Sequence, residues 1–596
     1  MRRAVLSAVV AAALAAPAQA LAHAQLEGTS PARDATVKTQ PAAVVFRFDE
    51  PVEGNFGAVR VFNSAGDRVD SGDAFHPNGT GSLMGVHLKP HLPAGTYTAT
   101  YRVVSADGHI VSSGFAFSIG HPGAAGKSVS SLLGGSGVGP GTEFAFGLAR
   151  GLQYSAIAIA GGAVLFLVAV WMGALGTAAR AGEEWAAASQ AFVGRLGRLI
   201  VVACAVGAIS AAAAVVLEAA SAAGISGWSA LKAGIVREEL STRFGTVWGL
   251  AVIAWVLATA VAAVWLSPRR SPVPVLRTAE LGATGVAVTG GRRFVPLLGL
   301  LAVPLGFVML VPALGGHASE QHPVWLLFPT NVVHVAGMSA WVGGLVTILV
   351  ALPAATRRLE REDRTRLLAA SLSRFSAIAL AAVAAILASG LIQAYVYVRT
   401  PAHLLDTAYG RCVLIKFLLL LALIGLGALN RRRTVPELQR LAGEGATPGH
   451  AGVVLRRALR AEVALIALVL GVTAALAAYA PSIQAQTGPV NITRIVGPAQ
   501  LEMTVDPGRV GENQIHLYLL NPKSGAQYTG AKEVDVAEKL PAKQVGPLQQ
   551  GAELAGPGHY IVQSALMNLP GKWDVTVTVR TSEFDEYSTT VKVSLR

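Results

Sequence analysis

The chain has 596 residues, of which 52% are hydrophobic and 14% are charged, and its formal net charge is +13. Soluble proteins carry roughly 25% charged residues, so this composition excludes a disordered chain and argues against a wholly soluble one. The two cysteines, Cys204 and Cys412, both lie in apolar runs and indicate neither a disulfide framework nor a cysteine-rich metal motif.

The first 22 residues have the pattern of a secretory signal peptide. Arg2 and Arg3 provide the basic start, and the apolar run 4–16 is shorter than the ~20 residues that a spanning helix needs. The small-x-small triplet 20–22 predicts cleavage before His23, which would then carry the amino terminus of the mature chain. The alternative is an uncleaved membrane anchor.

Residues 23–120 consist of short runs in which apolar and polar residues alternate, separated by turn clusters. One such run is 44–48 and another is 97–103. This pattern predicts a small all-β domain, an antiparallel sandwich or barrel of immunoglobulin-like type. Residues 121–143, which are rich in Gly and Ser, predict a flexible linker.

Long apolar runs dominate residues 144–480, and each is long enough to cross a hydrocarbon core of ~30 Å. We count eight of them, at 148–176, 196–220, 245–266, 294–314, 326–352, 375–398, 411–429 and 458–480. The sequence therefore predicts an all-α membrane bundle of about eight transmembrane helices, with a lipid bilayer as its partner.

Arginines are concentrated in alternate loops of this region. The loops after the first, third, fifth and seventh runs are rich in arginine, as at 431–433, whereas the loops between them are poorer. The positive-inside rule then places both ends of the region outside a bacterial inner membrane. The positive charge is a topology signal, and we expect no nucleic-acid partner.

Residues 482–596 become polar and strand-like again. The runs 515–519 and 573–579 alternate apolar and polar residues, and 587–595 is a third predicted strand. This pattern predicts a second all-β sandwich. An even number of spans places it on the same outer side as the first.

Candidate metal ligands occur at two places in the first β domain. A terminal His23 would offer an amine and an imidazole from one residue. Asp107 and His109 would offer a carboxylate and a second imidazole around Gly108, which permits a sharp backbone path. Such a set of nitrogen and oxygen donors suits Cu(II). The alternative is a solvated turn and an ordinary chain end.

Three motifs of this domain resemble the CopC family of periplasmic copper-binding proteins. They are His23-Ala24-Gln25-Leu26 followed by Ser30-Pro31, the strand motif 46–53, and the segment 101–109 that ends in Asp107-Gly108-His109. The resemblance implies that His23, Asp107 and His109 bind Cu(II), with Glu50 supporting those ligands. The methionine-rich Cu(I) site of some family members is absent, so we expect no Cu(I) site in this domain.

The membrane region resembles the CopD family of copper-uptake membrane proteins through looser motifs. The matching residues are Gly316-His317-Ala318, His334, 341–345, 374–376, Tyr409-Gly410, Lys416 and Glu462. The order of the domains is that of known CopC–CopD fusions. The Pro-Gly-Lys-Trp turn at 570–573 gives the tail a weak resemblance to the YtkA-like β-sandwich modules that follow some CopD domains.

Ionisable groups within a bilayer are costly and often functional. His334 lies inside the fifth run, and Met338 shares its helix face one turn later. Met309 nears the outer end of the fourth run, and His317 lies just beyond it. Imidazole and thioether groups suit Cu(I), so these residues form a predicted copper path. The alternative is that His334 bonds a neighbouring helix and the methionines only pack.

Three further ionisable groups are predicted to be buried partners in the membrane region. The sequence leaves their pairing open between an ion pair and a path for protons or metal. They are Glu218, Lys416 and Glu462.

Three functions are compatible with these patterns. The first is copper handling, in which the outer domain captures Cu(II) and the membrane region transports copper, with uptake as the expected direction and other periplasmic copper chaperones as partners. The second is a copper redox enzyme built on an N-terminal histidine, which the anionic ligand Asp107 disfavours. The third is a periplasmic sequestration or assembly role without transport. We expect the first, and hence no enzymatic activity.

Overall fold

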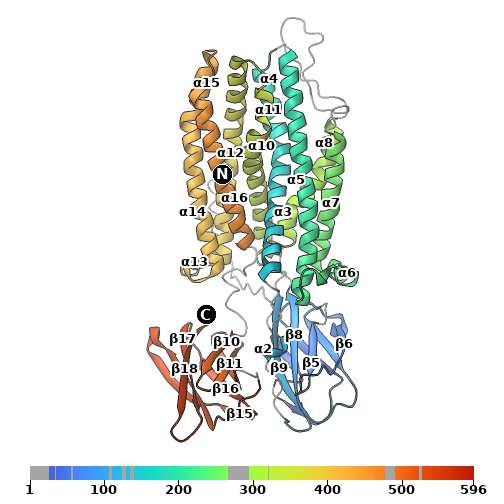
Figure 1. Cartoon of the computed structure of the whole chain (residues 1–596), viewed down its shortest axis with the longest axis vertical. Coiled ribbons are helices and arrows are strands. Elements are labelled where there is room, and N and C mark those ends of the chain that lie inside the picture. The colour runs from blue at the N-terminus through green and yellow to red at the C-terminus, as the bar shows by residue number, and fades with distance from the viewer. Residues whose placement is uncertain are drawn as a thin grey trace. The chain divides into compact units, whose positions relative to one another are not determined.

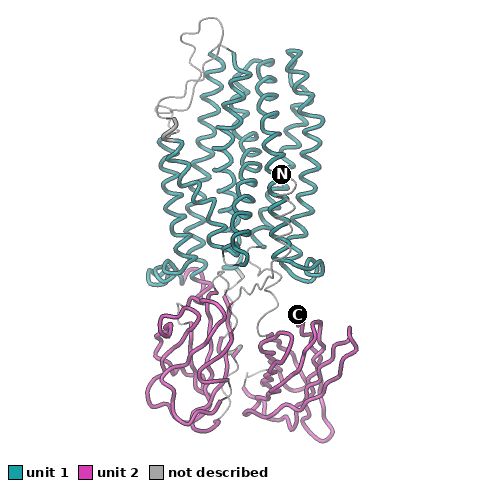
Figure 2. Tube along the Cα trace, turned by 180° about the vertical axis from the view of Figure 1, so that it is seen from behind, with its two compact units in different colours: residues 1–20, 139–219, 230–482 teal, residues 21–138, 220–229, 483–596 magenta. Residues whose placement is uncertain are grey.

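The computed structural model describes residues 24, 26–33, 35–54, 58–105, 110–123, 129–133, 140–180, 183–265, 294–319, 321–476, 490–522 and 526–595. The predicted signal peptide, residues 1–22, lies outside these residues. The chain divides into two compact units (Figure 2). One comprises the described residues within 139–219 and 230–482 and is helical; the other comprises those within 21–138, 220–229 and 483–596 and holds both β domains.

The N-terminal β domain is built from two sheets. Their strand orders are β1-β3-β7-β6 and β2-β9-β8-β4, with β5 also paired to β8. The strands are β1 (Leu26–Ser30), β2 (Thr36–Val37), β3 (Ala43–Phe48), β4 (Val52–Glu53), β5 (Val59–Phe62), β6 (Asp70–Phe75), β7 (Leu83–Leu88), β8 (Gly95–Ser105) and β9 (Ile110–Ile119), and a 3-10 turn η1 (Pro77–Gly79) precedes β7. The short helix α2 (Val129–Leu133) follows this domain.

Alternation of residue type explains the core of this domain. In β3, Val44, Phe46 and Phe48 are buried and Arg47 is exposed, because successive side chains on a strand point to opposite faces. The ring centroid of Phe46 lies 5.1 Å from that of Tyr101 in β8, in an edge-on arrangement that aromatic pairs prefer. The core therefore ties β3 to the long hairpin of β8 and β9.

The helical unit consists of long helices that run side by side (Figure 1). Three of them continue through π-helical turns, which are η2, η5 and η6. Two of its elements, α5 and η3, extend into the other unit. The elements are α3 (Pro140–Phe166), η2 (Leu167–Trp171), α4 (Met172–Ala178), α5 (Glu183–Ala223), η3 (Ser229–Leu231), α6 (Ala233–Ser241), α7 (Arg243–Trp265), α8 (Phe294–Leu314), η4 (His317–Ser319), α9 (Val324–Met338), η5 (Ser339–Gly343), α10 (Gly344–Val350), α11 (Leu352–Thr356), α12 (Arg361–Val398), α13 (His403–Asp406), α14 (Ala408–Leu429), η6 (Asn430–Thr434), α15 (Val435–Gly443) and α16 (Gly449–Leu476).

Seven helices of the described chain are long and apolar enough to cross a membrane, counting helices that continue through a π-helical turn as one. They span 141–178, 183–223, 243–264, 324–356, 361–398, 408–443 and 449–476. The run predicted at 294–314 forms α8, within which Leu298–Leu314 is a shorter apolar helix. The prediction of a multi-pass helical bundle is confirmed. Among the described residues, seven of the eight predicted runs form helices long enough to cross a membrane, and the eighth forms a shorter apolar helix.

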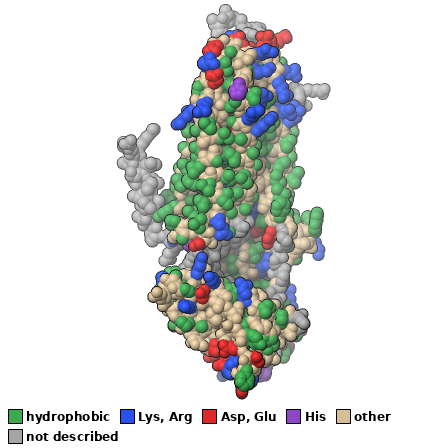
Figure 3. Space-filling view, turned by 60° about the vertical axis from the view of Figure 1, so that its left-hand side comes forward, with side chains coloured by type: hydrophobic (Ala, Val, Ile, Leu, Met, Phe, Trp, Pro, Cys, Tyr) green, Lys and Arg blue, Asp and Glu red, His purple; other side chains and the backbone are tan. Residues whose placement is uncertain are grey.

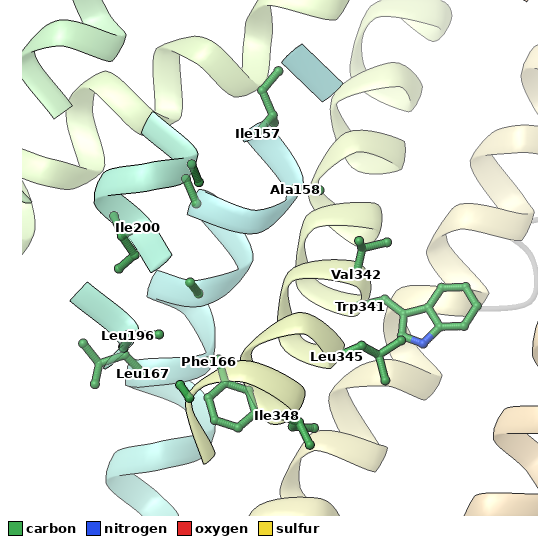
Figure 4. Close-up of a cluster of buried hydrophobic side chains, with 14 of the residues drawn as sticks. Ile157, Ala158, Phe166, Leu167, Leu196, Ile200, Trp341, Val342, Leu345 and Ile348 are labelled. Carbon is green, nitrogen blue, oxygen red and sulfur yellow. The ribbon is translucent and has the colours of Figure 1, made fainter. Parts of the chain in front are cut away.

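Small residues bring the backbones of α3 and η5 into contact. A Cβ added at Gly162 would lie 2.0 Å from the Ser339 carbonyl oxygen, and one added at Gly343 would lie 2.2 Å from the Ala158 carbonyl oxygen. Close approach through glycine is a common way for membrane helices to pack. Figure 4 shows the apolar side chains of α3, α5 and the η5–α10 segment, with Trp341 among them.

The C-terminal β domain also has two sheets, with orders β10-β11-β12-β16-β15 and β14-β13-β17-β18. A buried apolar core that includes Trp573 lies within it. The elements are β10 (Val490–Val496), β11 (Ala499–Asp506), β12 (Gly511–Leu520), β13 (Glu533–Leu540), η7 (Pro541–Lys543), β14 (Val545–Gly551), β15 (Glu553–Gly556), β16 (His559–Met567), β17 (Gly571–Arg580) and β18 (Glu586–Leu595). The predicted order of an all-β domain, a helical membrane region and a second all-β domain is confirmed.

Candidate functional site

Strand ends from both sheets meet at one end of the N-terminal β domain. Leu26, the first residue of β1, pairs with Phe48, the last residue of β3. After a three-residue connection, Val52 of β4 pairs with Ser105, the last residue of β8. The connection between β3 and β4 therefore links the start of β1 to the end of β8.

Glu50, the predicted supporting residue, lies in that connection and is half-buried. The backbone on both sides of it is hydrogen-bonded. The N–H of Phe48 donates to the Ser82 carbonyl at 2.8 Å, and the N–H of Val52 donates to the Gly81 carbonyl at 3.0 Å. These bonds give Glu50 a defined position at the end of the domain where the strand ends meet.

The predicted ligands His23, Asp107 and His109 lie outside the described residues, so their use as ligands stays a prediction. The residue that follows His23 is described. Ala24 is 3% exposed and belongs to the hydrophobic core. The chain is therefore anchored two residues before β1 begins.

The segment 106–109, which contains Asp107 and His109, connects β8 to β9. These strands pair at ten positions, from Gly95 with Ile119 to Val104 with Ile110. The last pair holds Val104 and Ile110, the described residues on either side of the segment, on neighbouring strands about 4.8 Å apart. The described strands thus fix where this segment leaves and re-enters the domain, at the same end as Glu50.

In the helical unit, His334 of α9 contacts α12. Its Nδ1 lies 3.1 Å from the Ser389 hydroxyl, which in turn donates to the Ala385 carbonyl at 2.6 Å. Because a hydroxyl has one proton, Ser389 accepts from an Nδ1–H of His334 in this arrangement. The lone pair of the ring is then on Nε2. A neutral histidine with a free lone pair is the form that binds metals.

The other residues of the predicted membrane path have different neighbours. The sulfur of Met309 lies 3.4 Å from the position that a Cβ would take at Gly161 of α3. The ring centroid of His317, in η4, lies 6.2 Å from that of Tyr397. Met338 is partly buried against the helical core. Among the described residues no group of three or more His, Cys, Asp or Glu is arranged to hold a metal, and the copper path stays a prediction.

Two of the three predicted buried groups have partners that the sequence did not identify. Glu462 of α16 accepts a hydrogen bond of 2.7 Å from the Asn430 amide. Glu218 of α5 lies 3.9 Å from the Arg150 guanidinium of α3. Asn430 was missed because it stands beside three arginines, where the sequence reads as a solvated loop, whereas in the structure it begins the π-helical turn η6. Lys416, the third, is half-buried on α14.

Residues 374–376, one of the motifs in the membrane region, hold α12 against its neighbours. The guanidinium of Arg374 fills the space beside Gly173 of α4, and the ring of Phe375 fills that beside Gly344 of α10. The Ser376 hydroxyl accepts a hydrogen bond of 2.8 Å from Arg431. These contacts give the motif a role in helix packing.

Three family models match separate parts of the chain. They are a CopC domain at residues 26–120, a copper resistance protein D-like N-terminal domain at 142–290, and copper resistance protein D at 369–476. Residues 291–368, between the two membrane matches, contain Met309, His317, His334 and Met338. The matches therefore do not extend to these predicted path residues.

The proteins to which this chain is similar include two relatives and one solved structure. "Copper transport protein CutJ" of Bacillus subtilis (strain 168) is 29% identical over 507 residues, which are 84% of this chain and 82% of the relative. "Protein YobA" of Escherichia coli (strain K12) is 32% identical over 98 residues, which are 16% of this chain and 79% of the relative. The crystal structure of CopC from Methylosinus trichosporium OB3b is 28% identical and covers 17% of this chain and 95% of that chain, with a TM-score of 0.15.

Proposed function

Because this chain belongs to the family of CopC–CopD fusion proteins, we propose that it captures Cu(II) with its N-terminal β domain and transports copper across a membrane. Its helical region makes it a multi-pass membrane protein. The observation that carries the capture step is the pairing of strand ends, Leu26 with Phe48 and Val52 with Ser105, beside Glu50.

In this proposal four donor groups hold Cu(II). They are the terminal amine and imidazole of His23, the imidazole of His109 and the carboxylate of Asp107, with Glu50 behind them. The anchoring of Ala24 and the pairing of Val104 with Ile110 support this set, since both fix the chain next to a ligand. Nitrogen and oxygen donors in a tetragonal arrangement favour Cu(II) over Cu(I).

The proposed transport step moves copper inward through the helical region of a bacterial inner membrane. In this proposal a one-electron reductant outside this chain converts the captured Cu(II) to Cu(I), which then passes by His334, Met338, Met309 and His317. The Nδ1–H tautomer of His334 supports it, because Nε2 then carries a lone pair. We place both β domains on the periplasmic side, where copper chaperones would deliver the ion.

The domain limits belong to the same proposal. We assign 1–22 to a signal peptide, 23–120 to the CopC domain, 121–143 to a linker, 144–480 to the membrane region and 482–596 to a YtkA-like domain. The function is binding and transport, without enzymatic activity.

Cu(II) titration of the purified full chain tests the capture step, with electron paramagnetic resonance as the readout. The mature chain that begins at His23 is compared with one that carries an extra alanine before His23. We expect one tight Cu(II) in the first and at least tenfold weaker binding in the second, because the extension removes the amine-imidazole chelate. His109→Ala should weaken binding similarly, and His121→Ala, at an exposed histidine, should not.

Equal and weak binding by both N-termini would overturn the capture step. Copper accumulation in cells that lack the protein tests the transport step separately. Unchanged accumulation alongside intact Cu(II) binding would overturn uptake and favour sequestration.

A further inference from the structure

The C-terminal β domain holds two histidines in direct contact. The Nδ1 of His516, in β12, lies 3.3 Å from the Nε2 of His559, in β16, and the two rings are 16° from parallel. The ring of Tyr518 stacks on His559 with centroids 4.2 Å apart. Two ring nitrogens therefore converge on the same point.

The register of the sheet explains why these side chains meet. Ile515 and Leu517 of β12 point into the core, so His516 and Tyr518 occupy the opposite face. Tyr518 pairs directly with His559 across the two strands. His516 is thus the diagonal neighbour of His559 on that face, within reach of a long or aromatic side chain.

Both imidazoles are neutral at neutral pH. Burial lowers the pKa of His559 to about 3 and that of His516 to about 4, and the positive charge of Arg33 adds to the second shift. One facing nitrogen carries the shared hydrogen and the other carries the lone pair. A change of tautomer in one ring presents both lone pairs, so a cation can replace the shared hydrogen without net release of a proton.

Two carboxylates lie on β11 near His516. Glu502 and Asp506 stand two residues on either side of Thr504, the partner of His516, and Asp506 is ion-paired with Arg33. Among the described residues no third His, Cys, Asp or Glu stands with the pair as a metal-holding group. Glu502 shares the face, but it pairs with Tyr518, which separates it from His559 by two strand spacings of about 4.8 Å.

A site with two facing nitrogens suits only some ions. Zn(II) takes four ligands and Cu(II) prefers tetragonal sets, whereas the filled d shell of Cu(I) accepts two imidazoles in a line. A monovalent soft cation fits this geometry.

We propose that His516 and His559 form a two-coordinate Cu(I) site on the β12–β16 face of the C-terminal domain. The ion is bound without electron transfer, through His516 Nδ1 and His559 Nε2. The choice of copper rests on the proposed function, while the coordination number rests on the histidine pair itself.

Anaerobic Cu(I) titration of the purified full chain against a chromophoric Cu(I) chelator tests this site. The variants are His516→Asn and His559→Gln, whose amides stand near the positions of Nδ1 and Nε2 and preserve a hydrogen bond while removing an imidazole donor. His450→Gln is the matched control, because His450 is an exposed histidine at the start of α16.

We expect each of the two variants to bind one Cu(I) equivalent fewer than the wild-type chain and the control variant to bind the same number. The X-ray absorption difference between wild type and His516→Asn should show a short shell of two nitrogens. Equal Cu(I) stoichiometry in all four proteins would overturn the site. So would an X-ray absorption difference showing that the lost Cu(I) had sulfur ligands or four ligands. Cu(II) titration of the same samples reports the N-terminal domain, so failure here and failure of the proposed function are distinguishable.

Discussion

Glu538 of β13 is a carboxyl group placed among apolar side chains. It is 1% exposed, and neither of its carboxylate oxygens makes a hydrogen bond within the described residues. Burial raises its pKa to about 7, because a buried charge lacks the stabilisation that water gives. The acid form of Glu538 is therefore favoured in the folded domain below about pH 7.

This shift predicts a stability that falls as the pH rises. The pKa is higher in the folded than in the unfolded chain, so the contribution of Glu538 is complete below its usual value of about 4.3 and is lost as the pH passes through 7. Glu538→Gln should stabilise the domain by about 1–3 kcal/mol at pH 8 and have little effect at pH 4. Amide hydrogen exchange of β13 in the full chain measures this at each pH.

Glu533→Gln is the matched control for Glu538→Gln. Glu533 lies on the same strand, but it is exposed and paired with Arg580, and such surface pairs contribute about 0–1 kcal/mol. The compared quantity is the difference in β13 amide protection between the wild-type chain and Glu538→Gln. The same difference at pH 4 and at pH 8 would contradict the prediction.

The contact of His334 with Ser389 predicts a graded effect on transport. His334→Ala removes the proposed ligand and should lower copper accumulation at least tenfold. Ser389→Ala removes only the hydrogen bond that orients the ring, worth about 1 kcal/mol, and should lower accumulation several-fold. His450→Ala, at an exposed histidine, should have no effect. Equal accumulation in all three variants would assign His334 to helix packing.

The sequence predicted which segments form membrane-spanning helices, and the structure shows which contacts pack these helices together. Apolar length alone located each run, since a spanning helix needs ~20 apolar residues. The π-helical turn at 339–343 and the crossing of Gly162 with Gly343 leave no mark in hydropathy, because they depend on which faces meet. The hydrogen bond from Asn430 to Glu462 was hidden for the same reason: its residues are 32 positions apart.

The crossing of α3 with η5 predicts a severe effect from one methyl group. Gly162→Ala places a Cβ 2.0 Å from a backbone oxygen, which cannot move aside as a flexible side chain can. We expect a loss of at least about 1–3 kcal/mol, measured as a lower temperature of unfolding in detergent. Gly147→Ala on the same helix meets no atom within 4 Å and should be neutral or stabilising. Equal unfolding temperatures for both variants would contradict this packing.

For the whole chain, the order of the domains could be predicted from composition. The full set of copper ligands could not be derived from the residues alone. Alternation located strands at 44–48 and 97–103, and the structure shows that the connection after the first, which contains Glu50, leads to β4, which pairs with the end of the second at Ser105. The ligands themselves were assigned by resemblance, because spacing alone cannot tell an Asp-Gly-His turn that binds metal from one that is merely solvated. The histidine pair 516 and 559 was missed because its residues are 43 positions apart.

The alternating arginine loops predict the orientation of the chain. Figure 3 shows Lys and Arg side chains gathered at one end of the helical unit and apolar side chains covering the helices below them. Reporter fusions after residues 280 and 445 should be active only inside the cell, and fusions after residues 226 and 402 only outside. An active external reporter within 431–457 would contradict the orientation.

The ten-position pairing of β8 with β9 has a consequence for how this protein can change over evolution. Side chains on a strand alternate between faces, so inserting or deleting one residue within 95–105 would turn core residues such as Tyr101 to the opposite face and put buried threonines such as Thr100 into the core. Selection for folding therefore removes insertions and deletions in this strand, whatever their effect on metal binding. The number of residues between the core and Asp107 and His109 is then inherited together with the core.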